Sequence, residues 1–146
     1  MSALKIKNLS HKIKKDNILN NISLETEDDK ITCILGPSGS GKTTILKLIA
    51  GLENIQNGEI HIKNKIVSSL NLHIKTENRN IGFLFQDFAL FPHLTVEENL
   101  KFAINDNVNV DLEISEIIKL IKLPHSLHKY PHELSGGEQQ RVALAR

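Results

Sequence analysis

The residues best suited to binding an anion lie in a glycine-rich stretch, GPSGSGKT, at residues 36–43. The stretch fits the spacing G-x-x-x-x-G-K-[ST], in which glycines let successive backbone N–H groups surround a phosphate. Lys42 adds a positive charge for the outer phosphates, and Thr43 adds a hydroxyl oxygen of the kind that Mg²⁺ binds. The predicted contacts are Gly36, Pro37, Ser38, Gly39, Ser40, Gly41, Lys42 and Thr43, with Thr44 as a further donor.

The elements on either side of this loop agree with a phosphate site. Residues 31–35, ITCIL, form a β-branched apolar run that predicts a buried strand leading into the loop. Apolar residues then recur at helical spacing from Ile45 to Leu52, which predicts an amphipathic helix starting near Gly41. A loop that only turns the chain would not account for both flanks. The motif does not distinguish kinases, GTPases and transport ATPases.

A second candidate anion site lies near the end of the sequence, in LSGGEQQR at residues 134–141. Ser135 and Glu138 have the spacing of a capping box and predict a helix start. Gly136 and Gly137 fall in its first turn, although a helical glycine costs about 1 kcal/mol relative to alanine. Glycines there would let bare backbone N–H groups meet an anion closely. The alternative is a glycine-softened helix start without a ligand.

The remaining patterns position these two sites within an α/β fold. Alternating or continuous apolar residues predict strands at 4–6, 22–24, 58–67 and 81–85, with a turn at Asn57-Gly58. After residue 87 the pattern becomes helical. Thr95 and Glu98 form another predicted capping box. A helical face is predicted for Ile114, Ile117, Ile118 and Ile121, with Pro124 ending that helix.

Bulk composition restricts the class of protein. The 146 residues carry 18 basic and 17 acidic side chains, a net charge of +1, which argues against a nucleic-acid surface. Cys33 is the single cysteine, so no internal disulfide forms, and its place in the predicted buried strand suggests a packing role. Without a signal peptide or an apolar run of membrane-spanning length, we expect a soluble chain that could serve a membrane only from its side.

Four of the five phenylalanines lie close together in the middle of the chain. We expect Phe83 and Phe85, on the predicted strand, to belong to the core. Phe88 and Phe91, with Leu90, form an apolar cluster at the start of the helical half and suit an interface with another protein. The alternative for Phe88 and Phe91 is ordinary core packing.

Taken together, GPSGSGKT, FQDFALFPHLTVEENL and YPHELSGGEQQRVALAR resemble the ATP-binding subunits of ABC transporters along the whole chain. The resemblance implies a P-loop NTPase fold, binding of ATP and Mg²⁺, and a head-to-tail dimer. Each ATP would lie between the glycine-rich Walker A loop of one subunit and the signature helix, after Ser135, of the other. Ser135 and Gly137 would contact the γ-phosphate of the partner's ATP, with Gly136 and Glu138 in the same turn. Gln86 would be the Q-loop glutamine, touching Mg²⁺ and the attacking water.

The resemblance also implies a function and a location. Phe88, Leu90 and Phe91 would form part of the groove for a coupling helix of the membrane permease. The motif sequences are most similar to those of importers of iron(III), polyamines, sugars or inorganic anions, and they do not identify the solute. The ATPase would be peripheral, on the cytoplasmic side of the cell membrane. The alternatives are a soluble ABC-type ATPase acting on ribosomes or DNA, and a non-catalytic nucleotide-binding fragment.

Two departures from the family pattern stand out. Ile13 occupies the position of an adenine-stacking aromatic residue, where it would contact the base more weakly, and His11 is a possible substitute. A Walker B strand with its catalytic glutamate, and a switch histidine, do not occur before Arg146. We therefore interpret 1–146 as a partial domain, with a nucleotide-binding core (1–86) and a helical subdomain (87–146). The missing part of the core sheet predicts an inactive, poorly soluble chain by itself.

Overall fold

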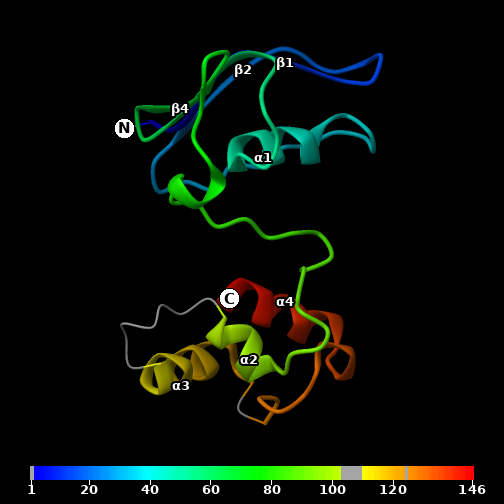
Figure 1. The fold of residues 1–146 in the computed structure, drawn as a ribbon, viewed down its shortest axis with the longest axis vertical. Helices are drawn as coiled ribbons and strands as arrows, with labels where there is room; N and C mark the ends of the chain where they lie inside the picture. The colour runs from blue at the N-terminus through cyan, green and yellow to red at the C-terminus, as the bar shows by residue number, and fades with distance from the viewer. Residues whose placement is uncertain (1, 103–109, 124) are drawn as a thin grey trace. The chain divides into compact units, whose positions relative to one another are not determined.

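The computed structural model describes residues 2–102, 110–123 and 125–146, except for the side chains of residues 110–113. The chain divides into two compact units, Met1–Phe83 and Leu84–Arg146, each described here by itself. In Figure 1 the first unit contains the labelled strands and α1, and the second contains α2, α3 and α4. No helix in the described ranges is long and apolar enough to cross a membrane.

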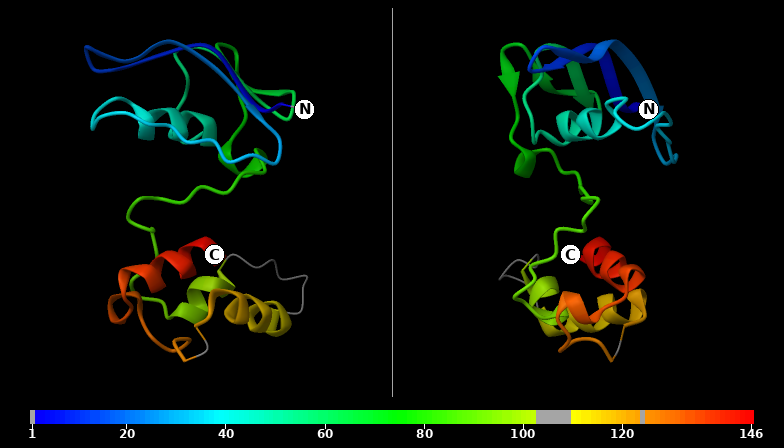
Figure 2. Two further views of the ribbon diagram at one scale, coloured as in Figure 1. Left: turned by 180° about the vertical axis from the view of Figure 1, so that it is seen from behind. Right: turned by 90° about the vertical axis from the view of Figure 1, so that its right-hand side faces the viewer.

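The first unit is an antiparallel sheet packed on one helix. Its strands are β1 (Ser2–Ile13), β2 (Asp16–Glu27), β3 (Asn57–Ile62), β4 (Lys65–Ser69) and β5 (Leu72–His73), in the order β2-β1-β3-β4-β5. The helix α1 (Lys42–Ala50) lies against one face of this sheet (Figure 2). The buried apolar cluster between them consists of Ile6, Leu9, Leu19, Ile45, Leu48, Ile60 and Val67. The strands predicted around residues 4–6 and 22–24 are confirmed as parts of β1 and β2.

The single strand predicted for residues 58–67 is wrong, because the segment is a hairpin of β3 and β4. The connection is the pair Lys63 and Asn64, with φ angles of 46° and 64°. Two consecutive residues with positive φ match the twist of a tight hairpin better than an ordinary turn does. Asn57-Gly58, the predicted turn, instead begins β3. A Cβ on Gly58 would lie 2.7 Å from the carbonyl oxygen of Asn8, so glycine permits a close approach of β3 to β1.

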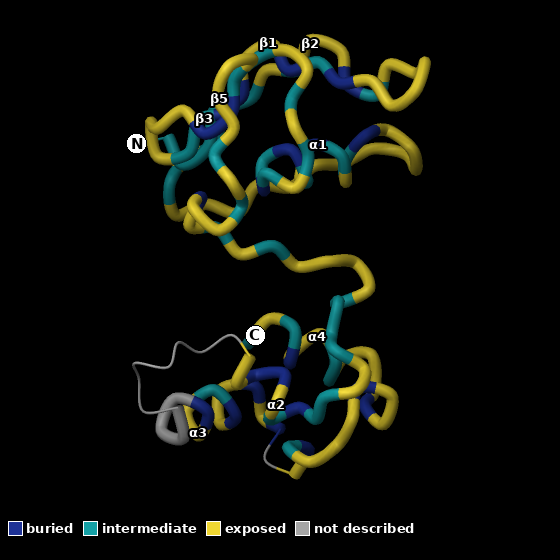
Figure 3. The backbone as a smooth tube through the Cα atoms, in the orientation of Figure 1, coloured by how far each residue is buried: buried dark blue, intermediate teal, exposed yellow. Residues whose placement is uncertain are grey.

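The strands predicted at residues 31–35 and 81–85 are absent, since neither segment joins a ladder in the described part of the chain. Ile31 is 95% exposed and Leu35 is 89% exposed, and the expected burial of Cys33 is also wrong (Figure 3). An apolar run becomes a strand only where another strand pairs with its backbone. The described sheet pairs β1 to β5 with one another and provides no such neighbour for these runs.

The helix α1 follows the predicted periodicity but ends earlier than Leu52. Gly51 adopts a left-handed conformation with φ of 78° and donates its N–H to the carbonyl oxygen of Leu48 at 3.2 Å. The N–H of Leu52 donates to the carbonyl oxygen of Lys47 at 3.0 Å. This pair of bonds closes the helix after Ala50, as a glycine stop signal does.

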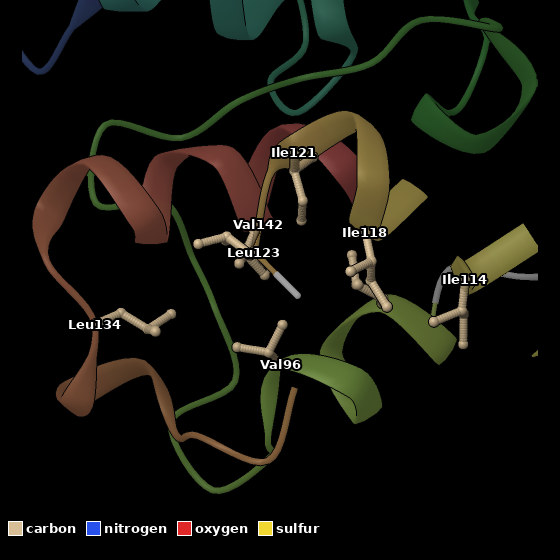
Figure 4. Packing of buried hydrophobic residues seen from close by; sticks show 8 residues of the cluster. Val96, Ile114, Ile118, Ile121, Leu123, Leu134 and Val142 are labelled. Atoms are coloured by element: carbon tan, nitrogen blue, oxygen red, sulfur yellow. The ribbon is translucent and has the colours of Figure 1, made fainter. Parts of the chain in front are cut away.

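The second unit is a small helical bundle built around one apolar cluster. Its helices are α2 (Val96–Lys101), α3 (Val110–Ile121) and α4 (Gly136–Ala145), with a short 3₁₀ turn, η2 (Pro131–Glu133), before α4. The buried side chains are Val96, Leu100, Ile114, Ile118, Ile121, Leu123, Leu134 and Val142 (Figure 4). Ile117 packs against them, which confirms the predicted isoleucine face. Pro124, the predicted end signal of α3, lies outside the described residues.

Candidate functional site

The glycine-rich loop forms a turn that is held together by the side chain of Lys42. Its Nζ donates hydrogen bonds to the carbonyl oxygens of Gly36 at 2.9 Å and Pro37 at 2.6 Å. The backbone N–H of Ser40 donates to the Pro37 carbonyl oxygen at 3.3 Å. Lys42 is the first residue of α1, and its ammonium group therefore reaches back to the beginning of the loop. Its present partners are neutral oxygens, and an anionic oxygen would be a stronger acceptor.

Gly41 is the N-cap of α1, and its conformation suits only glycine. Its φ is 86°, and an added Cβ would lie 2.9 Å from Cδ2 of Leu19 and 3.0 Å from Cγ2 of Ile18. The loop is thus packed tightly on β2. No side chain caps the first turn of α1, and that turn contains no acidic residue. The positive end of the helix dipole is consequently left for an external anion.

The donors present in this loop fit the phosphates of a nucleotide. Residues 36–40 are exposed, and so is Thr43 in the first turn of α1. The Thr43 hydroxyl is an oxygen ligand suited to Mg²⁺, which usually completes its shell with phosphate oxygens and water. No group of three or more histidine, cysteine, aspartate or glutamate side chains in the described ranges could hold a metal by itself.

The start of α4 has the predicted capping box in full. The carboxylate of Glu138 accepts hydrogen bonds from the Ser135 hydroxyl at 2.7 Å and from the Ser135 backbone N–H at 2.8 Å. The Ser135 hydroxyl bond is the main cause that lowers the pKa of Glu138 from its ordinary value, and the backbone bond adds to it. The box that was predicted at Thr95 and Glu98, ahead of α2, is also complete. Both predicted helix starts are confirmed.

Gly136 and Gly137 face open space. A Cβ added at Gly136 would meet no atom within 4 Å, and one at Gly137 would come no closer than 3.7 Å, to Nη1 of Arg141. Both residues are exposed, and neither has a positive φ. Packing among the described residues of the second unit therefore does not require glycine at either position. Close approach of a ligand to the bare backbone would explain the two glycines, and a glycine-softened helix start without a ligand is the alternative.

The two residues considered for contact with a base lie in different environments. Ile13, at the end of β1, is 45% exposed and so is available for an apolar contact. His11 is 6% exposed, with its Nε2 atom 3.6 Å from the carboxylate of Glu53. A side chain buried in this way cannot stack on a base. His11 as a substitute for an aromatic residue is therefore wrong.

Gln86 is exposed in a tight turn at the start of the second unit. The backbone N–H of Phe88 donates to the carbonyl oxygen of Phe85 at 3.0 Å, and Phe88 and Ala89 have positive φ angles of 62° and 46°. A bulky residue with positive φ stores strain, which is common in functional loops. Phe85 is 38% exposed, so its predicted place in the core is wrong. Thr43 and Gln86 belong to different units.

Phe88, Leu90 and Phe91 are all half-buried, which leaves part of each side chain accessible. The loop that carries Phe91 is organised by Asn99, a residue that the sequence analysis missed. Asn99 is fully buried, and its Nδ2 donates to the carbonyl oxygens of Phe91 at 3.1 Å and Leu94 at 3.0 Å. A usable signal existed, because Asn99 is polar yet shares the buried face of α2 with Val96.

A glycine-rich loop that joins a lysine to an uncapped helix start defines the class of phosphate-binding P-loop proteins. The comparisons identify the family within that class: the ABC transporter family matches residues 19–146, and this chain belongs to it. The predicted family and the α/β P-loop fold class are both confirmed.

Curated proteins that are similar to this chain include import ATP-binding proteins. The sulfate/thiosulfate import ATP-binding protein CysA of Vibrio cholerae is 38% identical over 99% of this chain and 39% of its own length. The Fe(3+) ions import ATP-binding protein FbpC of Fusobacterium nucleatum is 39% identical over 98% of this chain and 38% of its own length. The chain thus spans about two fifths of the length of these two curated relatives.

Solved structures agree with this assignment. The dimeric bacterial ABC transporter cassette MJ0796 superposes with a TM-score of 0.80 at 34% identity, over 97% of this chain and 67% of that one. Another structure of the same cassette, in a post-hydrolysis state, contains ADP and phosphate. CbiO1 of Clostridium perfringens, part of the transporter complex CbiONQ, has a TM-score of 0.81 at 27% identity over 99% of this chain and 60% of that one.

Proposed function

We propose that this chain is the nucleotide-binding part of an ABC importer ATPase, which couples the binding and hydrolysis of ATP to solute uptake. The observation that carries the proposal is the start of α1. There an N-cap glycine, an uncapped and acid-free first turn and the Lys42 ammonium surround one exposed loop. This combination provides positive charge and backbone donors for a triphosphate without any competing carboxylate.

In this proposal the phosphates are held by residues 36–43, with Thr44 as an additional donor. Lys42 exchanges the carbonyl oxygens of Gly36 and Pro37 for phosphate oxygens, a change from neutral to charged acceptors. Thr43 and Gln86 are the proposed protein ligands of Mg²⁺, which would neutralise charge on the phosphates. Ile13 makes an apolar contact with the base. We assign 1–86 to nucleotide binding and 87–146 to the helical part.

We further propose that two ATP-binding subunits assemble head to tail. Ser135, Gly136, Gly137 and Glu138 of one subunit would then meet the γ-phosphate held by the Walker A loop of the other. The open space at Gly136 and Gly137 supports this arrangement, since a side chain at either position would separate the backbone from a ligand. The dimeric form of the similar cassette MJ0796 supports it as well.

The membrane partner is proposed to be a permease that contacts Phe88, Leu90 and Phe91. All three side chains are half-buried and apolar, and Phe88 lies in a turn with positive φ angles. The ATPase would then be peripheral, on the cytoplasmic side of the membrane. The named relatives import sulfate, thiosulfate and iron(III) ions, and a small inorganic ion is the solute class that we propose.

The nucleotide site is tested by Lys42→Ala, with binding of a fluorescent ATP analogue and Mg²⁺ as the readout. A hydrogen bond to a charged group contributes about 1.5–3 kcal/mol, so affinity should fall at least about tenfold. Lys47→Ala is the matched control. Lys47 is on the last turn of the same helix, with Nζ 3.5 Å from Glu53, and its loss should leave nucleotide affinity unchanged. Equal affinity of the Lys42→Ala variant and the wild type would refute the assignment.

A further inference from the structure

The ring of Phe91 contacts three side chains of the second unit. The Phe102 ring lies 4.6 Å away between centroids, and the His93 ring lies 6.1 Å away. Arg146 places its Cζ atom 5.0 Å from the centroid of the Phe91 ring. The guanidinium therefore lies within the range of a cation–π interaction, which extends to about 6 Å.

Arg146 has an unusual environment for a cation. Its Nη1 atom is buried and has no hydrogen-bond partner among the described residues. A buried donor without an acceptor is costly unless another interaction compensates for it. The face of the Phe91 ring carries partial negative charge and is the group placed to do so. Desolvation strengthens this contact, so the position of the guanidinium and that of the ring depend on each other.

The backbone of Phe91 is fixed independently of its ring. Its N–H donates to Oδ1 of Asn99 at 2.9 Å, and its carbonyl oxygen accepts from Nδ2 of Asn99 at 3.1 Å. Asn99 is in α2, which begins at the Thr95–Glu98 capping box. The main chain of Phe91 is therefore attached to α2, whereas its ring is in contact with Arg146. Movement of Arg146 would reorient the ring without displacing the loop.

Arg146 extends the same helix that starts at the signature turn. Its N–H donates to the carbonyl oxygen of Val142 at 3.0 Å, which continues the hydrogen-bond pattern of α4. At about 1.5 Å per residue, the ten residues of α4, Gly136–Ala145, span about 15 Å. A hydrogen-bonded helix of this length moves as a rigid rod. Such a helix is a rigid element of the kind that can carry coupling between its first turn and Arg146.

We propose that Arg146 is a positioning residue, which connects the nucleotide-contacting turn of α4 to the orientation of the Phe91 ring on the permease-docking surface. This inference rests on the proposed function, which assigns Ser135 and Gly137 to the nucleotide and Phe91 to the permease. The physical element is the helical segment that begins at the Ser135 capping box and carries the cation–π contact of Arg146.

The test uses the full protein with 4-fluorophenylalanine introduced at position 91 and read by fluorine NMR, with MgATP as the added ligand. In the wild type, nucleotide should shift the ring signal. In Arg146→Met, which keeps the length of the side chain but removes the cation, that shift should fall at least about twofold. The lost contact is expected to bias the ring population about 2- to 30-fold at typical cation–π strengths. Nucleotide affinity, measured in parallel, should stay at the wild-type level.

Two control variants separate this role from a general effect of removing a positive charge. Arg146→Lys keeps a cation and should retain part of the response. Lys119→Met removes an exposed cation from α3 of the same unit and should retain all of it. The inference is overturned if MgATP binds but the ring signal of the wild type does not change, or if Arg146→Met responds fully. Absence of MgATP binding to the wild type would instead refute the proposed function, and this inference with it.

Discussion

The guanidinium of Arg79 fills the space that a side chain on Gly51 would need, since a Cβ at Gly51 would lie 2.6 Å from Cζ of Arg79. Arg79 is only 3% exposed, and burial lowers its pKa. Its Nη1 donates to the carbonyl oxygens of Leu48 at 3.1 Å and Ile49 at 2.9 Å. A buried cation thus binds the C-terminal end of α1, the helix whose other end forms the candidate phosphate site. A cation at the C-terminal end of a helix also interacts favourably with the helix dipole.

Gly51→Ala should destabilise the first unit for two reasons. Alanine in a left-handed conformation costs about 1–2 kcal/mol, and its methyl group would displace Arg79 from its carbonyl acceptors. We expect the free energy of unfolding to fall by at least that amount, measured from urea titrations. Gly82→Ala is the control, because a Cβ there meets no atom within 4 Å. Similar urea midpoints for the two variants would show that Arg79 is not held against Gly51.

Sequence patterns predicted the local elements well where one segment contains the whole signal. The capping boxes at Ser135 and Thr95 are examples, because cap and partner lie three residues apart. The predicted strand at 31–35 failed because pairing depends on other segments, and apolar composition does not specify a partner. The hairpin turn at Lys63 was missed because lysine is not a typical turn residue with positive φ.

In the candidate site, too, contacts within one segment could be predicted and contacts between distant segments could not. The Walker A motif specifies its own loop, so the contacts of Lys42 with nearby carbonyl groups follow from local sequence. The packing of Gly41 against Leu19 joins residues far apart in the chain and could not be predicted. Arg79 gave no periodic signal, although it binds the far end of α1. Long-range contacts of single polar residues have no pattern that one sequence can reveal.

Asn99→Ala should destabilise the second unit more than an exposed substitution does. It removes the acceptor of the Phe91 N–H and the donor for three carbonyl groups, of Phe91, Leu94 and Thr95. An unsatisfied buried polar group costs about 1–3 kcal/mol, so a total loss of about 2–4 kcal/mol is expected. Helical circular dichroism during urea unfolding measures it, with the exposed Gln140→Ala as control. A loss below that of the control would contradict the role of Asn99.

Glu138→Gln should remove the acid sensitivity of the start of α4. The folded pKa of Glu138 is lowered from 4.5, first by the Ser135 hydroxyl bond. The carboxylate therefore stabilises the folded state above pH 4.5, and this contribution disappears as pH falls through the lowered folded pKa. Glutamine keeps an acceptor but does not titrate. The wild type should be more stable than the variant at about pH 7, and the difference should disappear in acid, below the lowered folded pKa of Glu138. Urea midpoints at both pH values measure it, and a constant difference would argue against the capping carboxylate.

Gly136→Ala should stabilise the helix and impair its function at the same time. The new methyl group meets no atom of the described residues within 4 Å, and alanine favours a helix over glycine by about 0.5–1 kcal/mol. The urea midpoint should therefore rise. If this turn meets the nucleotide of a second subunit, the methyl group would separate the backbone N–H groups from the phosphate. Association of the full protein with MgATP, followed by light scattering, should then weaken at least about tenfold, or about 1.4 kcal/mol.

The control for this last substitution is Gln140→Ala, an exposed position further along the same helix. It should leave MgATP-dependent association at the wild-type level, because it lies beyond the turn that contains Ser135, Gly136 and Gly137. Increased stability together with unchanged association of Gly136→Ala would support the alternative, a glycine-softened helix start with no ligand. Increased stability with weakened association would show that the chain gives up helix stability here in exchange for access of a ligand to its backbone.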